Sequence, residues 1–469
     1  MSDQAALPEA RATAQPTSLY SYYVVALLTI GYVFNFIDRK IVAIASPALK
    51  ADLGLSDGEL GLLKGFAFAL LYTVAGIPIA RWADRSSRVR IVSIAVVVWS
   101  FFTVISGLAQ NFWQMLAARV GVGVGEAGGS PPSHSIIADY FPKEKRATAL
   151  GIYSLGVPIG IMFAYLAGGF IVQYFGWRWA FFAVGAPGVL LGLLIYLTVR
   201  EPERGAMDSA ADRKAAAEAK RAGAGVTIRD AATHLFSIPT YAYACAGITL
   251  ASFSGYAASF WIVDFFVRVH PQLPFGTLIL AFGLISGIGF GLGTFMGGYL
   301  TERAAQKDLR NYMLFPAVGI GLSAPLWLLQ FLATDPWMAM CYGLILQITL
   351  GFYLAPTFAM AQTLAPITMR ALSTAILFFV LNLIALGFGP TFVGWASDWF
   401  TADCIRAAAS AGAASAQCLA EAKAAGADGG TALRWALILS GLPLILASLS
   451  YWRASFFIKE DWHKATGGH

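Results

Sequence analysis

Long apolar stretches separated by short polar segments run through this chain of 469 residues. Seven of the stretches contain no Asp, Glu, Lys or Arg, and each is long enough to cross a bilayer as a helix, which takes about 20 residues. They lie at 91–118, 147–177, 179–199, 271–301, 311–334, 336–369 and 371–397. Further apolar segments lie near 20–37, 60–80, 239–263 and 435–452, and the run 91–139 divides at Gln110-Asn111 into two spans. The pattern predicts an all-α integral membrane protein with twelve transmembrane helices.

The composition agrees with this prediction, because 58% of the residues are apolar and only 12% are charged, whereas about a quarter of the residues of a soluble protein are charged. The first 19 residues are polar and lack the basic start of a signal peptide, so we expect no cleavage before the first span. The net charge of +6 is spread over short loops without a separate basic domain. We therefore expect contact with anionic membrane lipids and no binding of nucleic acid.

Basic residues lie mainly in alternate loops, which predicts that these loops face the cytoplasm. They are Arg81, Arg85, Arg88, Arg90, Lys143, Lys145, Arg146, Arg303, Lys307 and Arg310, together with Arg200, Arg204, Arg213, Lys214, Lys220, Arg221 and Arg229. Because the number of predicted spans is even, both termini are expected on the cytoplasmic side of the cell inner membrane.

A polar segment at 200–238 divides the chain into two halves, 20–199 and 239–458, with six predicted spans each, and the tails 1–19 and 459–469 are expected to be cytoplasmic. The halves share loop motifs. Trp82-Ala83-Asp84-Arg85 follows the second span and Leu300-Thr301-Glu302-Arg303 the eighth, while Pro142 and Arg146 follow the fourth span and Pro366 and Arg370 the tenth. The repeat predicts two pseudo-symmetric six-helix bundles, as in duplicated transporters.

The loop after the second span resembles a known signature. Residues 80–88 read A-R-W-A-D-R-S-S-R, which is similar to the G-x-L-A-D-R-x-G-R loop of the major facilitator superfamily, with Ala80 and Ser87 in place of its glycines. The resemblance implies that Asp84, with Arg85 and Arg88, holds a cytoplasmic gate; the alternative is that these charges only set topology. By the internal repeat, the candidate gate residues are Asp84, Arg85, Arg88, Glu302, Arg303, Arg146 and Arg370.

Ionisable residues lie inside two predicted spans of the first half. Arg119 and Glu126 stand in R-V-G-V-G-V-G-E-A and are seven residues apart, so both lie on one helix face. Their segment resembles the R-x-x-x-G-x-G pattern that is tied to proton coupling in the superfamily. Asp38 and Arg39 lie in the first span, at a depth similar to that of Arg119 by helical rise. Charges inside a membrane are costly and usually mark ion or substrate paths.

These residues suggest a mechanism for proton coupling. Burial favours the neutral form of a carboxyl group, whereas a nearby Arg favours the charged form. We expect Asp38 and Glu126 to bind protons alternately as Arg119 shifts between them; a purely structural salt bridge is the alternative. Candidate proton-coupling and substrate residues are therefore Asp38, Arg119, Glu126, Arg39 and Asn35.

Three motifs of the first half resemble the Spinster branch of the superfamily. They are Asn35-x-x-Asp38-Arg39, Gly125-Glu126-Ala127, and the segment from Ser133 to Pro142 with Arg146. The resemblance implies a proton-linked transporter for lysolipids, sphingoid phosphates or related amphiphiles. The first two motifs also occur in anion:cation symporters, which move small organic acids, so an organic-anion transporter is the alternative. A membrane sensor without transport activity is a third possibility.

The second half offers few charges in its spans. Its polar residues there include Tyr256, Gln347, Tyr353 and Asn382, which we expect to face a substrate cavity with an apolar wall suited to an amphiphile; packing in the core is the alternative. We expect a monomer without a cofactor. No phosphate-binding loop, no metal-ligand spacing and no nucleophile with a nearby base is found in the sequence, so an enzyme is not expected. Cys404 and Cys418 share the loop before the last span, where a disulfide is permitted outside the cell.

Overall fold

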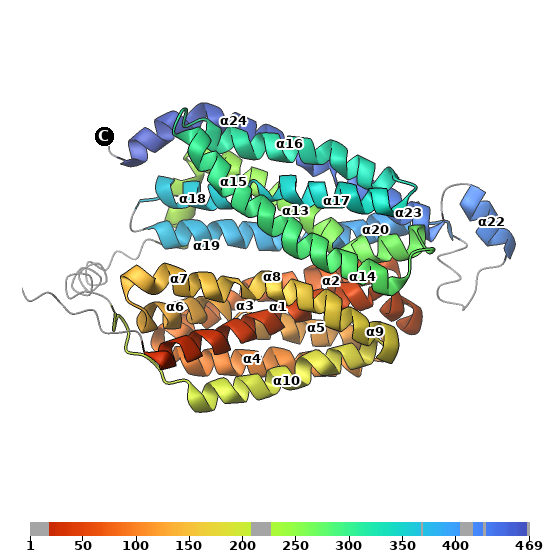
Figure 1. Ribbon diagram of the computed structural model, residues 1–469, viewed down its shortest axis with the longest axis horizontal. Helices are drawn as coiled ribbons and strands as arrows, with labels where there is room; N and C mark the ends of the chain where they lie inside the picture. Colours follow the sequence, from red (N-terminus) through yellow and green to blue (C-terminus); the bar gives the residue numbers. More distant parts are fainter. Residues whose placement is uncertain (1–17, 208–226, 367–368, 404–415, 425–427, 467–469) are drawn as a thin grey trace, which may run out of the picture.

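The computed structural model describes residues 18–207, 227–366, 369–403, 416–424 and 428–466. Within these ranges the chain is helical and contains no strand. The helices form two bundles whose long axes run side by side, with the first half drawn from red to yellow and the second from green to blue (Figure 1). The all-α membrane architecture is therefore confirmed.

The first bundle is built from the helices that precede residue 199. They are α1 (Leu19–Leu53), α2 (Asp57–Lys64), α3 (Phe66–Arg85), α4 (Arg88–Gly107), α5 (Phe112–Glu126), α6 (Ser130–Tyr140), α7 (Lys143–Ser154), α8 (Gly156–Phe163), the π-helix η1 (Ala164–Gly168), α9 (Gly169–Phe175) and α10 (Trp177–Thr198). Five stretches of this bundle are long and apolar enough to cross a membrane: Leu19–Leu53, Asp57–Gly76, Arg88–Gly107, Thr148–Phe175 and Trp177–Thr198.

The second bundle follows residue 227. Its helices are α12 (Ile228–Phe236), α13 (Pro239–Val269), α14 (Phe275–Leu284), η2 (Ile285–Gly289), α15 (Phe290–Ala305), α16 (Asn311–Leu332), α17 (Pro336–Gly351), α18 (Leu354–Leu364), α19 (Arg370–Leu381), η4 (Asn382–Phe388), α20 (Gly389–Phe400), α22 (Ala416–Ala424), α23 (Gly429–Leu439) and α24 (Leu442–Thr466). Each π-helix packs against a helix of the other half: η1 on α14, η2 on α8 and η4 on α3.

Eleven helical stretches in the described residues are long and apolar enough to cross a membrane, whereas the sequence predicts twelve spans. The difference lies in the fourth predicted span, which is divided into α5 and α6 by a turn at 127–129. Glycine is a weak helix former, and proline lacks the backbone donor of a helix interior. Gly128 and Gly129, followed by Pro131 and Pro132, therefore interrupt the helix.

The two halves meet most closely where α2 packs against α20. A side chain on Gly394 would place its Cβ 2.2 Å from the backbone oxygen of Asp57, and one on Gly65 would place it 2.5 Å from the oxygen of Gly387. Only glycine permits such approach. We call the end of the molecule where α2, α20 and the last turn of α13 meet the closed end. In the described part of the chain, α6 and α7 form no comparable interface with α18 or α19 at the opposite end.

We expect Gly394→Ala to favour separation of the halves at the closed end by about 1–3 kcal/mol, because the added methyl group meets a backbone atom that cannot turn away. The measurement is the distance between spin labels at Leu108→Cys and Thr334→Cys, which lie on exposed positions of the two halves, in protein whose exposed Cys341 is replaced by alanine. The matched control is Gly291→Ala, where a Cβ meets nothing within 4 Å. Equal distance distributions for the two variants would contradict the expectation.

Candidate functional site

Two buried ion pairs join α1 to α5 inside the first bundle. Arg119 Nη1 lies 3.1 Å from Asp38 Oδ2, and Arg39 Nε lies 2.7 Å from Glu126 Oε2. The side chain of Arg39 is 15% exposed, while the other three are at most 3% exposed. Asp38 and Arg39 are consecutive in α1, so this helix supplies the carboxylate of one ion pair and the guanidinium of the other.

The surroundings fix these side chains. The Thr103 hydroxyl of α4 donates a hydrogen bond of 2.7 Å to Asp38 Oδ1. The guanidinium of Arg39 lies over three aromatic rings, those of Phe36, Phe68 and Tyr72, at 5.2, 5.0 and 4.9 Å from the ring centroids. Cation–π contact of this kind stabilises a charge that has left water.

The cluster also has unused hydrogen-bonding atoms. Among the described residues, Glu126 Oε1, Arg119 Nε and Asn35 Oδ1 are buried without a hydrogen-bond partner. Buried polar atoms are normally paired, so unpaired ones point to a ligand, a water molecule or a change of partner. We infer that the cluster is not locked into one arrangement.

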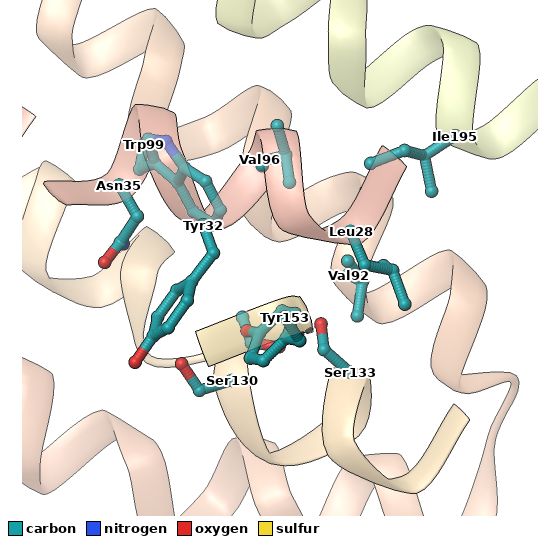
Figure 2. Close-up of a pocket in the computed structure, with 12 residues that line it drawn as sticks. Leu28, Tyr32, Asn35, Val92, Val96, Trp99, Ser130, Ser133, Tyr153 and Ile195 are labelled. Carbon is teal, nitrogen blue, oxygen red and sulfur yellow. Dashed lines mark hydrogen bonds between the residues drawn. The ribbon is translucent and has the colours of Figure 1, made fainter. Parts of the chain in front are cut away.

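Asn35 also lines a small cavity in the first bundle (Figure 2). Hydroxyl groups of Tyr32, Ser130, Ser133 and Tyr153 gather along one side of it, and apolar residues line the other. The apolar residues include Leu28, Val92, Val96, Trp99 and Ile195. The cavity places hydroxyl groups next to Asn35, at the level where α5 ends and α6 begins.

The sequence predicts that Arg119 moves between Asp38 and Glu126. In this structure Arg119 binds Asp38, and Glu126 binds Arg39 instead. The movement itself stays a prediction. What the structure adds is a second cation for the second carboxylate, so that an exchange of partners leaves no charge alone.

The predicted gate residues lie at the opposite end of the molecule from the closed end. Arg88 donates to Asp139 and to Glu201, whose Oε1 lies 2.8 Å from Arg88 Nε. Arg88 and Asp139 belong to the first half and Glu201 to the segment that follows it, so none of these contacts reaches the second half. The pKa of the Glu201 carboxyl is lowered: burial raises it, but hydrogen bonds from the Val89 amide and from Arg88 outweigh burial.

The other gate candidates come from both halves of the chain. Arg146 Nη2 donates to the Ala138 oxygen at 2.7 Å. Arg85, Glu302, Arg303 and Arg370 are exposed, and Arg303 lies 5.2 Å from the centroid of the Tyr299 ring. Asp84 belongs to the last turn of α3, but its side chain lies outside the described part of the structure. The gate role of these residues stays a prediction.

Sequence reasoning missed a charged network at the closed end. Arg268 at the end of α13 binds Asp57 at the start of α2 with two hydrogen bonds, of 2.7 and 2.8 Å. Lys50 and the Ser397 hydroxyl also bind Asp57. Asp398 of α20 accepts from the backbone amides of Asp57 and Gly58 at 3.0 and 2.7 Å. A carboxylate there satisfies free amides of a helix N-terminus, so the second half caps a helix of the first.

Deeper in the same interface, Lys64 of α2 binds Asp264 of α13 at 2.6 Å, and both side chains are fully buried. The Lys64 ammonium lies 3.7 Å from the centroid of the Trp261 ring, and the Ser46 hydroxyl of α1 also donates to Asp264. The predicted seventh span ends at residue 263, just before this carboxylate. The sequence does contain an indication of this network, because Asp264 and Arg268 are four residues apart and therefore lie on one face of the helix.

The predicted cavity residues of the second half separate into different environments. Gln347 lines a small cavity with Gln330, Ser259 and Ser286. Tyr353 is buried, and its hydroxyl lies 2.9 Å from Ser252 Oγ. Tyr256 packs near Phe260, and Asn382 begins η4. The substrate role of the four predicted residues stays a prediction.

The predicted disulfide falls partly outside the structure. Cys418 takes part in a disulfide, but Cys404 lies outside the described residues, so the pairing stays a prediction. Cys245 is a buried free thiol, as expected for a core residue, whereas the free thiol of Cys341 is exposed on the surface of α17. In the described part of the chain, no group of His, Cys, Asp and Glu could hold a metal ion.

Comparison with known proteins agrees with this arrangement. The family model of the Major Facilitator Superfamily matches residues 28–390. An MFS-type efflux pump of Mycolicibacterium smegmatis is 31% identical over 381 residues, which cover 81% of this chain and 85% of that protein. A sphingosine-1-phosphate transporter of Xenopus tropicalis is 27% identical over 389 residues, covering 79% of this chain and 73% of that protein.

A solved structure is similar as well. The crystal structure of a bacterial homologue of the human lysosomal transporter Spinster, in an inward-facing and unoccupied conformation, has a TM-score of 0.82 and 32% sequence identity, covering 95% of this chain and 98% of that one. The fold and the buried charges thus define a multi-pass membrane transporter rather than an enzyme. The chain belongs to the major facilitator superfamily, and its resemblance to Spinster proteins is confirmed.

Proposed function

We propose that this transporter is driven by protons, works by alternating access and carries an amphipathic substrate of the lysolipid or sphingolipid kind. The observation that carries the proposal is the double ion pair of α1 and α5. Arg39 and Glu126 lie beside Asp38 and Arg119 inside the membrane, where charges are rarely kept without a role in transport.

The geometry supports proton coupling in the following way. Protonation of Glu126 removes the negative charge that holds Arg39, and the unpaired Oε1 of Glu126 is available to a proton carrier. Released Arg39 then competes with Arg119 for Asp38. Because Asp38 and Arg39 lie on α1, which contacts α13 of the second half, a change of partners in the first bundle acts on the contact between the bundles.

Alternating access is supported by the uneven contact between the halves. Charged and glycine contacts join them at the closed end, and the similar crystal structure is that of an inward-facing protein. We propose that the closed end faces away from the cytoplasm, in the cell inner membrane, and that both termini are cytoplasmic. The transport cycle then requires the closed-end network to break while the opposite end closes around the predicted gate residues.

The amphipathic substrate is supported by the contrast between the two halves. Charges gather in the first bundle, while the membrane-spanning parts of α14 to α19 carry aromatic and amide side chains. An amphiphile needs such a pairing of a polar and an apolar wall. A similar protein of Xenopus tropicalis is named for transport of sphingosine-1-phosphate, which is an amphiphile.

The proposal is tested with purified protein in liposomes that contain a pH-sensitive dye. Lysolipids with different head groups and, separately, small organic acids are added, and substrate-induced proton flux is recorded. We expect flux with at least one lysolipid and none with the acids. Flux with acids alone would support the organic-anion transporter, and binding without any flux would support the sensor.

A further inference from the structure

Lys40 differs from the other buried cations in the structure. It follows Arg39 in α1, is only 7% exposed, and has no carboxylate within ion-pair distance in the described part of the chain. Its ammonium donates to the Ser259 hydroxyl of α13 and lies 4.6 Å from the centroid of the Phe260 ring. A buried ammonium with only a neutral oxygen and a ring beside it is costly.

The buried carboxylates of α1, α2, α5 and α13 are already engaged by other cations. Asp38 binds Arg119, and Glu126 binds Arg39. Lys64 holds Asp264, and Arg268 holds Asp57. Since each of these acids has its own cation, Lys40 is a surplus positive charge at the interface of the two halves. An interior that keeps such a charge is suited to a negatively charged ligand.

Ser259 connects Lys40 to a small cavity on the second half. Residues of α13, α14, η2, α16 and α17 line this cavity, together with Tyr165 of the first half. The same cavity is lined by Ser286, Gln330 and Gln347, and no acidic residue is among its lining residues. The hydroxyl and amide groups of these side chains donate hydrogen bonds. The remaining wall is apolar and includes Phe282, Trp327 and Leu350.

We propose that Lys40 and this cavity form the subsite for the anionic head group of the substrate, a phosphate, sulfate or carboxylate. The inference rests on the proposed function, because it names the chemistry of the polar end of the amphiphile. Charge-assisted hydrogen bonds from Lys40 hold the anion, and the serine and glutamine donors complete its shell. Lys40 belongs to the first half and Ser259 to the second, so an anion that takes Lys40 also removes one bond between the halves.

The test measures binding to protein in nanodiscs of zwitterionic lipid by quenching of tryptophan fluorescence. The probes share one oleoyl chain and differ in the head group: oleoyl lysophosphatidate, oleate and neutral monooleoylglycerol. We expect the wild type to bind at least one anionic probe about ten-fold more tightly than monooleoylglycerol, as for a charged hydrogen bond. Lys40→Gln should bring the two affinities close together and leave that for monooleoylglycerol unchanged.

Three further variants separate recognition from folding. Lys40→Arg keeps the charge and should keep most of the preference for the anion. Ser259→Ala removes one donor of the proposed shell but not the charge, so it should weaken the preference for the anion in part and leave the affinity for monooleoylglycerol unchanged. Lys464→Gln, at an exposed lysine paired with Glu460, is the control and should match the wild type. If Lys40→Gln aggregates, Ser259→Ala decides: a preference for the anion equal to that of the wild type overturns the subsite.

The outcomes divide clearly. A preference that survives Lys40→Gln, or an equal loss of affinity for charged and neutral probes, overturns the subsite. A preference for lysophosphatidate over oleate identifies phosphate as the head group, and the reverse identifies carboxylate. Inorganic phosphate and galactonate, a small organic acid, are tested as well. If either binds in a Lys40-dependent manner while no oleoyl probe binds, the subsite stands and the amphiphile proposal fails.

Discussion

Proton-driven uptake by the Glu126→Gln protein is expected to fall about a hundred-fold, at the upper end of usual coupling energies, while substrate exchange without a pH gradient persists. Glutamine has the shape of glutamate but does not bind or release a proton at the pH of the assay. Its amide oxygen can still accept a hydrogen bond from Arg39, but it carries no negative charge. Since Glu126 is fully buried and bound to Arg39 at 2.7 Å, no water compensates for the lost charge. Proton binding and the release of Arg39 are thereby uncoupled.

The measurement compares initial uptake into proteoliposomes with an imposed pH gradient and equilibrium exchange at equal pH on both sides. Glu460→Gln is the matched control, because Glu460 pairs with Lys464 on the surface; it should behave as the wild type. Asp38→Asn is expected to reduce coupling too, since Asp38 is the other carboxylate of the cluster. Unaltered pH dependence in both Glu126→Gln and Asp38→Asn would show that these residues do not carry the proton.

Asp264→Asn is expected to destabilise the closed end by about 3–5 kcal/mol, because it leaves the fully buried Lys64 without a counter-charge. The halves should then separate at this end, where Lys64 can reach water. The distance between spin labels at Leu108→Cys and Thr334→Cys reports that opening. A shift of this size moves a two-state equilibrium from mostly closed to mostly open.

The control for this prediction is Asp308→Asn, whose partner Lys459 lies 3.0 Å away on the surface. Exposed ion pairs contribute about 0–1 kcal/mol, so this variant should keep the label distances of the parent. The double variant Lys64→Met with Asp264→Leu should close again, because an apolar pair of similar size often replaces a buried ion pair without loss. Label distances that do not change in Asp264→Asn would show that the pair does not hold the halves together.

The sequence predicts the membrane spans well because about twenty apolar residues in a row rarely occur in a helix that water surrounds. The same contrast reveals Asp38, Arg119 and Glu126, since a charge stands out within an apolar stretch. Sequence alone could not assign their partners. Arg119 and Asp38 are 81 residues apart in the chain, and which arginine meets which carboxylate depends on how α1 and α5 are rotated against each other.

The closed-end network is harder to predict from the same pattern. Asp57 and Asp264 stand at the ends of predicted spans, where charges are common and usually solvated. They become significant only because α2 and α13 come from different halves and meet in space, with Lys64 and Asp264 separated by 200 residues in the chain. Lys40 is inconspicuous in the sequence because its neighbours Asp38 and Arg39 belong to a known motif, and only the structure shows that its charge has no acid partner in the described residues.

The contact between Asp398 and the start of α2 links transport to local folding. The amides of Asp57 and Gly58 have no partner within their own helix, as at every helix N-terminus, and they are satisfied by a carboxylate of the opposite half. Separation of the halves therefore leaves the first turn of α2 without this cap. Each opening of the closed end therefore frees two backbone amides of α2 while the Ser56 cap of the same turn stays in place, and each closing restores the carboxylate cap.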